Sequence, residues 1–390
     1  MDSKERNVIA SIDEIALDNM LLTTGTTVGG EIVRTICGVV AGILLIAGLA
    51  LGQARQDTAA WNFAVSGDSR NCGDVVMPAI AAGVLRDGAA FYWHLGDFRD
   101  IDTFDEDIVY QPEHIAKPLV ISDYEAAAWP DFIDSQLAPF GSIPIFLALG
   151  NHETTPPKTR ADLMQQFADW FNSPAIVHQR LLDNPKDHLT KFHYHWIDRG
   201  VAFYTLDNAS VDQFDSVQIR WFERVLAHDA ADPRITAVVV GMHEALPDSI
   251  GASHSMNDSA MGTESGRRVY ADLLRLQNES DKHVYVLASH SHFFMDGIFN
   301  TDYWRTHGGV LPGWIVGTAG AVRYPLPANA GDAHAAQTNV YGYMLATVRP
   351  SGDIRFEFKK LTESDVPAPV ASRYGADFVH WCWAENTQAK

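Results

Sequence analysis

Short apolar runs alternate with polar turns along most of this chain. Their order is β-α-β in the first half and mostly β in the second, which is typical of an α/β fold. We expect two packed mixed β-sheets flanked by helices. Strands are predicted at residues 61–66, 89–95, 143–149, 193–197, 201–206, 235–241, 284–288, 295–299, 314–316, 341–348 and 354–359. Helices are predicted at residues 74–86, 160–171, 216–227 and 266–276.

Two stretches do not follow this alternation. Residues 101–140 carry Tyr, Trp, Pro and acidic residues without clean periodicity, and we expect a helical or loop insertion there. Residues 247–265 are rich in Ser, Gly, Asn and Asp, which indicates a mobile loop. Within it, His254 is a candidate for substrate contact. Elsewhere, Asp123-Tyr124 and Arg323-Tyr324 are candidates for the pocket wall, with packing or surface roles as the favoured alternative.

Five of the apolar runs end on side chains that can bind a metal ion. The clearest case is the run 143–149, which stops at Gly150-Asn151-His152-Glu153. Ligands of α/β proteins bind beyond the carboxyl ends of the strands, so we expect these polar side chains to face one spot. The five blocks contain Asp68, Asp97, Asn151 with His152, His243, and His290 with His292.

The chemistry of these side chains favours particular metals. Carboxylate, amide and imidazole ligands together suit Mn, Fe or Zn better than Ca or Mg. The ligands are too many for one ion, and carboxylates can bridge, so a pair of ions is expected. Two metals about 3.5–4 Å apart can clamp a phosphate and acidify a bridging water into the hydroxide that attacks phosphorus.

The five blocks in this order resemble the calcineurin-like metallophosphoesterases, to which the purple acid phosphatases are related. The family pattern runs D-x-H, G-D-x-x-D/N, G-N-H-E/D, an isolated His and G-H-x-H, and the similarity covers about residues 60–320. The resemblance implies that one carboxylate bridges two ions, and that a non-ligand His steadies the transition state or protonates the leaving oxygen. By this resemblance Asp97 bridges, Asp68 and His292 hold the first ion, Asn151, His243 and His290 hold the second, and His152 is the non-ligand His.

The sequence departs from the family pattern at two positions. Arg70 stands where the first block of the family has a His, and a guanidinium cannot bind a cation, so the first ion loses a ligand. Asp100, at the position where purple acid phosphatases place a Tyr, is a possible extra ligand. Arg70 can instead grip the substrate phosphate with its planar fork of donors. The last block reads Ser289-His290-Ser291-His292, without the Gly of the family.

Charge limits the partners. The formal net charge is −20, and an acidic body repels the phosphate backbone of nucleic acids and anionic membranes. We therefore expect a small phosphorylated substrate drawn in by local cations, and no nucleic acid. No Pro/Ser-rich linker or internal repeat divides the chain, so residues 55–390 are expected to form one metallophosphoesterase domain.

The N-terminal segment 1–54 is set apart by its composition. Residues 35–54 carry no charge and are largely apolar, and Gly52-Gln53-Ala54 suits a signal peptidase. The segment is expected to be a signal peptide cleaved after Ala54, with an uncleaved membrane anchor as the alternative. Either reading predicts an exported, periplasmic, secreted or anchored protein. In an oxidising compartment Cys72 and Cys382 can form a disulfide, with two buried thiols as the alternative.

The sequence thus predicts an exported, dinuclear metal-dependent hydrolase of phosphoric monoesters or diesters. The alternative is a non-catalytic, metal-stabilised binding protein on the same scaffold, which the Arg70 departure favours. A nuclease is disfavoured by the acidic body. The loops 101–140 and 247–265 are expected to roof the site and to decide the substrate.

Overall fold

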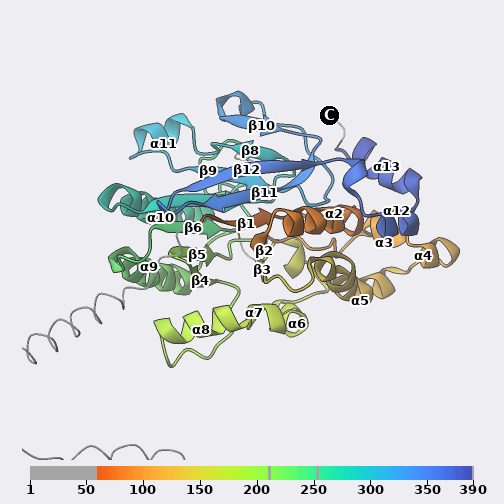
Figure 1. Cartoon of the computed structure of the whole chain (residues 1–390), viewed down its shortest axis with the longest axis horizontal. Helices are drawn as coiled ribbons and strands as arrows, with labels where there is room; N and C mark the ends of the chain where they lie inside the picture. The colour runs from red at the N-terminus through yellow and green to blue at the C-terminus, as the bar shows by residue number, and fades with distance from the viewer. Residues whose placement is uncertain (1–58, 210–211, 252–253, 389–390) are drawn as a thin grey trace, which may run out of the picture. The chain divides into compact units, whose positions relative to one another are not determined.

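Two β-sheets pack face to face in the computed structural model, and helices cover their outer faces (Figure 1). The structure describes residues 59–209, 212–251 and 254–388. They fall within one compact unit, Asp57–Lys390. The segment 1–54, predicted to be a signal peptide or anchor, lies outside the described residues.

The first sheet is mixed and has the order β12-β11-β1-β2-β3. Strands β1, β2 and β3 are parallel, whereas β11 runs antiparallel to both β1 and β12. The carboxyl ends of the three parallel strands therefore meet at the same edge. The strands are β1 Trp61–Ser66, β2 Ala89–His94, β3 Ile145–Leu147, β11 Tyr341–Val348 and β12 Ile354–Leu361.

The second sheet has the order β10-β8-β9-β7-β6-β5-β4. Its central strands β5, β6, β7 and β9 are parallel, and β4, β8 and β10 add antiparallel pairs at the two edges. The strands are β4 Tyr194–Asp198, β5 Val201–Thr205, β6 Ala237–Gly241, β7 His283–Ala288, β8 Phe294–Asp296, β9 Gly313–Val316 and β10 Ala335–Gln337.

The core between the sheets is rich in aromatic side chains. Phe63 of β1 and Phe91 of β2 stack with ring centroids 5.2 Å apart, and both meet the edge of Phe203 of β5 at 5.0–5.1 Å. Such aromatic pairs contribute about 0.5–1.5 kcal/mol each beyond the burial of their area. They hold the two sheets in a fixed relation, so the strand ends of both sheets are fixed as well.

Each outer face of the sandwich has its own helical cover (Figure 1). Helix α2 and the C-terminal helices α12 and α13 share an apolar cluster with the first sheet, and α9 and α10 share one with the second. The helices are α2 Gly73–Arg86, α3 Glu106–Val109, α4 Pro112–Ala116, α5 Ile121–Asp131, α6 Arg160–Gln166, α7 Ala168–Phe171, α8 Pro174–Asp183, α9 Ser216–Ala231, α10 Ala260–Glu279, α11 Asp302–Thr306, α12 Ala368–Tyr374 and α13 Ala376–Ala384. Among the described residues, no helix combines the length and the apolar character needed to cross a membrane.

The predicted fold class is confirmed, and most predicted strands lie within a residue or two of the observed ones. The insertion 101–140 is helical, as expected. Residues 260–265 were expected in a loop but belong to α10, because Ser259 caps the helix by accepting a hydrogen bond from the Gly262 N–H at 2.8 Å. The helix predicted at 160–171 is divided at Phe167 into α6 and α7. Elements β10, α8, α11, α12 and α13 were not predicted.

A disulfide joins Cys72, before α2, to Cys382 in α13 across 310 residues of sequence. This confirms the pairing that the sequence allowed. Both cysteines are fully buried in the cluster that α2 and α13 share with the first sheet. The bond therefore ties the C-terminal helices to the loop that follows β1.

We predict that Cys382→Ser lowers the free energy of unfolding by about 2–5 kcal/mol, because the cross-link closes a long loop in the unfolded chain. Urea denaturation with and without dithiothreitol measures this. The reductant should destabilise the parent and leave the variant unchanged. Equal stability of parent and variant without reductant would contradict the structure.

Beside the first sheet, one buried arginine neutralises a cluster of carboxylates. Arg99 is fully buried and forms ion pairs with Asp74, Asp105, Asp107 and Asp131. Burial raises the pKa values of Asp74 and Asp107, and raises that of Asp105 to about 6, although Arg99 works in the opposite direction. The cluster joins α2, α3 and α5, so it holds the insertion 101–140 against the sandwich.

We predict that Arg99→Met lowers the free energy of unfolding by about 3–5 kcal/mol, because it leaves buried carboxylates without a counter-charge. The loss should be larger at pH 8 than at pH 5. A carboxyl group whose pKa is raised in the folded state binds more protons folded than unfolded, so stability rises as the pH falls toward the unfolded pKa of 3.8. Urea denaturation at both pH values tests this, with the exposed Arg355→Met as control. An equal loss at both pH values would count against it.

Candidate metal centre

The polar blocks come together where the carboxyl ends of the parallel strands of one sheet meet those of the other. Asp68 follows β1, Asp97 follows β2 and Asn151 follows β3, all in the first sheet. His243 follows β6, and the block of His290 follows β7, both in the second sheet. Backbone hydrogen bonds join the two edges, such as that from the Gly67 N–H to the carbonyl of Val316 at 3.1 Å. The convergence expected from the sequence is thus present.

The loops that carry these side chains have an unusual backbone. Asp68, Asp97 and His290 adopt left-handed φ angles of 61°, 60° and 64°. Such conformations cost about 1–3 kcal/mol each in a non-glycine residue and gather at functional sites. Gly150 shows how closely the loops approach, because a Cβ there would lie 2.4 Å from the Asp97 backbone nitrogen. The loops are therefore shaped to aim these side chains inward.

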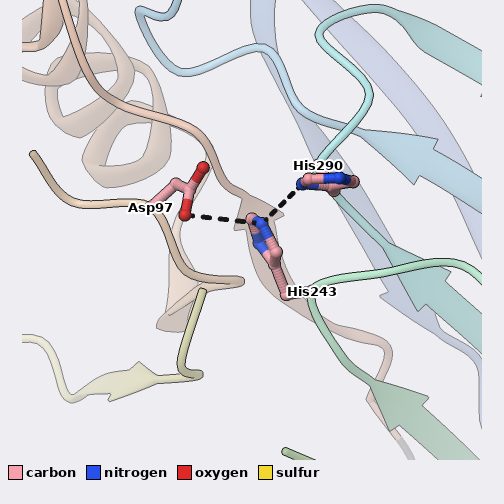
Figure 2. Close-up of side chains that lie close together, drawn as sticks. All are labelled: Asp97, His243 and His290. Carbon is pink, nitrogen blue, oxygen red and sulfur yellow. Dashed lines mark hydrogen bonds and ion pairs between the residues drawn. The ribbon is translucent and has the colours of Figure 1, made fainter. Parts of the chain in front are cut away.

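Three acceptor atoms gather around His243 Nε2. We call the four residues involved the second group: Asp97, Asn151, His243 and His290. From His243 Nε2, the distances are 3.0 Å to Asn151 Oδ1, 3.0 Å to His290 Nδ1 and 3.4 Å to Asp97 Oδ1. Figure 2 shows Asp97, His243 and His290 pointing toward one another. Ligand atoms of these three residues lie within 4.8 Å of each other.

The tautomer of His243 decides what the second group can bind. His243 Nδ1 lies 2.9 Å from the carbonyl of Leu95 and donates its proton there, which directs the lone pair of Nε2 at the other acceptors. Burial lowers the pKa of His243, but the charges of Asp97 and Asp68 outweigh it and raise that pKa. The spot thus favours positive charge, and its nitrogen and oxygen ligands fit a transition-metal ion.

The first group consists of Asp68, Asp97 and His292, and it is arranged differently. His292 Nε2 lies 3.3 Å from Asp68 Oδ1, and ligand atoms of the three residues lie within 4.8 Å of one another. His292 Nδ1 donates to the carbonyl of Val322 at 2.6 Å, so its Nε2 also faces the group as an acceptor. Here, however, a donor is present: Arg70 Nη2 lies 3.3 Å from His292 Nε2, and Arg70 Nε lies 3.5 Å from Asp97 Oδ2.

The comparison with protein families now decides the classification. The family model described as calcineurin-like phosphoesterase matches residues 72–294, more than half of the chain. The chain belongs to the calcineurin-like phosphoesterase family. Its domain is thus of the metal-dependent phosphoesterase class. The matched range begins after Asp68 and Arg70, so the departure at the first block lies outside it.

One solved structure shows the same fold at low identity, and two others align less closely. The purple acid phosphatase PPD1 from yellow lupin (Lupinus luteus) seeds aligns with a TM-score of 0.51 and 17% identity over 78% of this chain and 52% of that one. PhoD aligns with a TM-score of 0.48 and 13% identity over 78% and 72%, and a dimetal phosphatase from Danio rerio with 0.48 and 11% over 77% and 96%. The chain spans about half the length of the lupin protein. The comparison with curated protein sequences gives no match.

Two residues orient the candidate ligands of this phosphoesterase domain. The carboxylate of Glu153 is buried and accepts hydrogen bonds from the backbone N–H groups of Asp97 at 2.9 Å, Phe98 at 2.7 Å and Gly150 at 2.7 Å. Ser289 donates its hydroxyl to Asp68 Oδ2. Ser289 was not a candidate in the sequence, because the loss of the family Gly at that position carried no sign of a new hydrogen bond.

His152 lies beside both groups without joining them. Its backbone N–H donates to Asp97 Oδ1 at 3.1 Å, and its Nδ1 lies 3.3 Å from Asp100 Oδ1. Burial lowers its pKa, but the charge of Asp97 and the hydrogen bond to Asp100 raise it to about 9. Its side chain is 18% exposed, whereas that of Asp97 is 1% exposed. The His152 side chain therefore lies at the outer edge of the site, and its raised pKa favours the protonated form.

Asp100 contacts Arg70 and His152 rather than the first group. Its Oδ2 lies 3.1 Å from Arg70 Nη1, and with Asp102 and His152 it forms a separate cluster of possible ligands. At the edge of the site, Tyr324 stacks on His292 with centroids 4.0 Å apart, and His254 lies 5.5 Å from the ring of His290. Tyr324 and His254 thus lie next to candidate ligands, whereas the pocket candidate Arg323 is buried and donates to the carbonyls of Asn386 and Trp383.

We predict that Glu153→Gln weakens Mn²⁺ binding about 10–100-fold, because an amide cannot accept from all three N–H groups that hold the loops of Asp97 and Gly150. Calorimetric titration of the metal-stripped protein measures this. The exposed Glu357→Gln is the matched control and should keep the parent dissociation constant. An unchanged constant in Glu153→Gln would show that Glu153 does not position the ligands.

Proposed function

We propose that this protein is an exported, metal-dependent hydrolase of small phosphoric esters, either monoesters or diesters. The observation that carries this proposal is the convergence of three acceptor atoms on His243 Nε2 at 3.0–3.4 Å in a chain of the calcineurin-like phosphoesterase family. Mn, Fe or Zn fits that ligand set. When bound, the metal supplies Lewis acidity that polarises the ester and acidifies water.

The candidate catalytic residues of the chain are His152 and Arg70. Asp97 and Asp100 raise the pKa of His152 to about 9, and its side chain lies beside both groups, where it can donate a proton to the leaving oxygen. Arg70 keeps a permanent positive charge at the inner wall, where negative charge develops on the phosphoryl oxygens. Asp97 holds the His152 backbone and faces both groups, so it couples proton donor and metal ligands.

Export is part of the proposal and rests on two features. Residues 35–54 have the composition of a signal peptide or membrane anchor. The disulfide between Cys72 and Cys382 is of the kind that persists in oxidising compartments. A periplasmic, secreted or membrane-anchored enzyme meets phosphoric esters outside the cytoplasm.

The test is turnover of a panel of phosphoric monoesters and diesters by protein loaded with Mn²⁺, Zn²⁺ or Fe. His152→Ala should lower turnover about 10²–10⁴-fold and keep its metal, because it removes the proton donor alone. His243→Ala should lose both metal and turnover. The exposed His188→Ala is the control and should match the parent.

A second function, a metal-stabilised binding protein without catalysis, is favoured by one observation: the guanidinium of Arg70 lies against the first group. This reading predicts tight metal binding without turnover of any ester in the panel. That result, with His152→Ala indistinguishable from the parent, would replace the enzymatic proposal.

A further inference from the structure

The two groups of candidate ligands share Asp97 but differ in one respect. In the second group, Asn151 Oδ1, Asp97 Oδ1 and His290 Nδ1 surround His243 Nε2, whose own ring proton is engaged by Leu95. Among the described residues, no Arg or Lys side chain forms an ion pair with any of these four atoms. In the first group, the acceptor atoms of His292 and Asp97 already face the guanidinium of Arg70 at 3.3 and 3.5 Å.

Arg70 is built into this position. Its residue is 7% exposed, and its Nη1 forms an ion pair of 3.1 Å with Asp100 Oδ2. A guanidinium is always protonated in proteins and has five N–H donors in a rigid fork, so it brings a fixed charge and fixed donors. Burial works against that charge, but Asp97, Asp100 and Asp68 outweigh it and raise the pKa of Arg70.

The partners of the first group are held toward Arg70 by independent contacts. Asp68 Oδ2 accepts from the Ser289 hydroxyl and from the His290 backbone N–H at 2.8 Å, which leaves Oδ1 facing the group. His292 is fixed by its donation to Val322 and by the ring of Tyr324 stacked on it. The lone pair of His292 Nε2, which a metal ion would need, is directed at Arg70 Nη2.

We propose that the guanidinium of Arg70 takes the place of the first metal ion, so that the centre holds one ion, in the second group. This inference rests on the proposed function and refines it: one side of the phosphoryl group is met by a metal and the other by a permanent organic cation. The cation offers donors and charge but no Lewis acidity. His292 therefore acts as an anchor of Arg70 rather than as a metal ligand, and Asp68, whose Oδ1 lies 3.3 Å from His292 Nε2, adds negative charge beside it.

The experiment counts metal in the full chain. The protein is stripped with a chelator, loaded with Mn²⁺, freed of excess ion and analysed for bound manganese and by electron paramagnetic resonance. The parent should bind about one ion per chain and show the six-line spectrum of an isolated Mn²⁺. Arg70→His, which restores the imidazole of the family pattern, should bind about two and show exchange coupling between them.

The exposed Arg355→His is the matched control and should stay at one ion. Two coupled ions in the parent would overturn the inference without touching the proposed hydrolase activity. An Arg70→His protein that still binds a single ion would also overturn it. One ion in the parent without ester turnover would instead remove the proposed function and leave the replacement of the first ion standing.

Discussion

A buried acceptor atom must face a donor or a cation, and this constraint governs the whole strand-end region. Asn151 Oδ1, His290 Nδ1 and Asp97 Oδ1 present lone pairs to His243 Nε2 at distances of 3.0–3.4 Å. Like-signed partial charges at that range repel in a low-dielectric interior. These four side chains would hold a metal ion, which would replace the repulsion between their lone pairs by attraction to the cation. The geometry of the loops is therefore that of a binding site for such an ion.

The fold holds this binding site rigid. The aromatic core between the sheets fixes the ends of β1, β2 and β3 against those of β6 and β7. The left-handed backbones of Asp68, Asp97 and His290 are costly. They persist because the Asp97 N–H donates to Glu153, the Ser289 hydroxyl donates to Asp68, and the sandwich holds the loops in place. The stability of the core thus offsets the backbone strain at the site. The strained backbone directs the ligand atoms to a single point.

Much of this arrangement could be predicted from the sequence. Apolar runs of strand length that end on Asp, Asn or His place those residues at one edge of parallel strands, so the convergence of Asp97 with His243 followed from pattern alone. The pairing of Cys72 with Cys382 was one of two open readings. The C-terminal helices α12 and α13 were not predicted, because their apolar residues face α2, far away in the sequence, rather than forming a clear periodic stripe.

Other features depend on contacts that no local pattern encodes. The direction of Arg70 could not be read from Asp68-Ser69-Arg70, since a long side chain can turn to substrate or to the ligands. Its place is decided by Asp100, thirty residues later, and by His292, more than two hundred residues later. The same holds for Ser289, whose hydroxyl reaches Asp68 across the two sheets.

The most direct measurement is an anomalous difference map from crystals of the Mn²⁺-loaded protein. We predict a peak within coordination distance of Asp97 Oδ1, Asn151 Oδ1, His243 Nε2 and His290 Nδ1. A map without a peak among these four atoms, in crystals that contain the metal elsewhere, would contradict it.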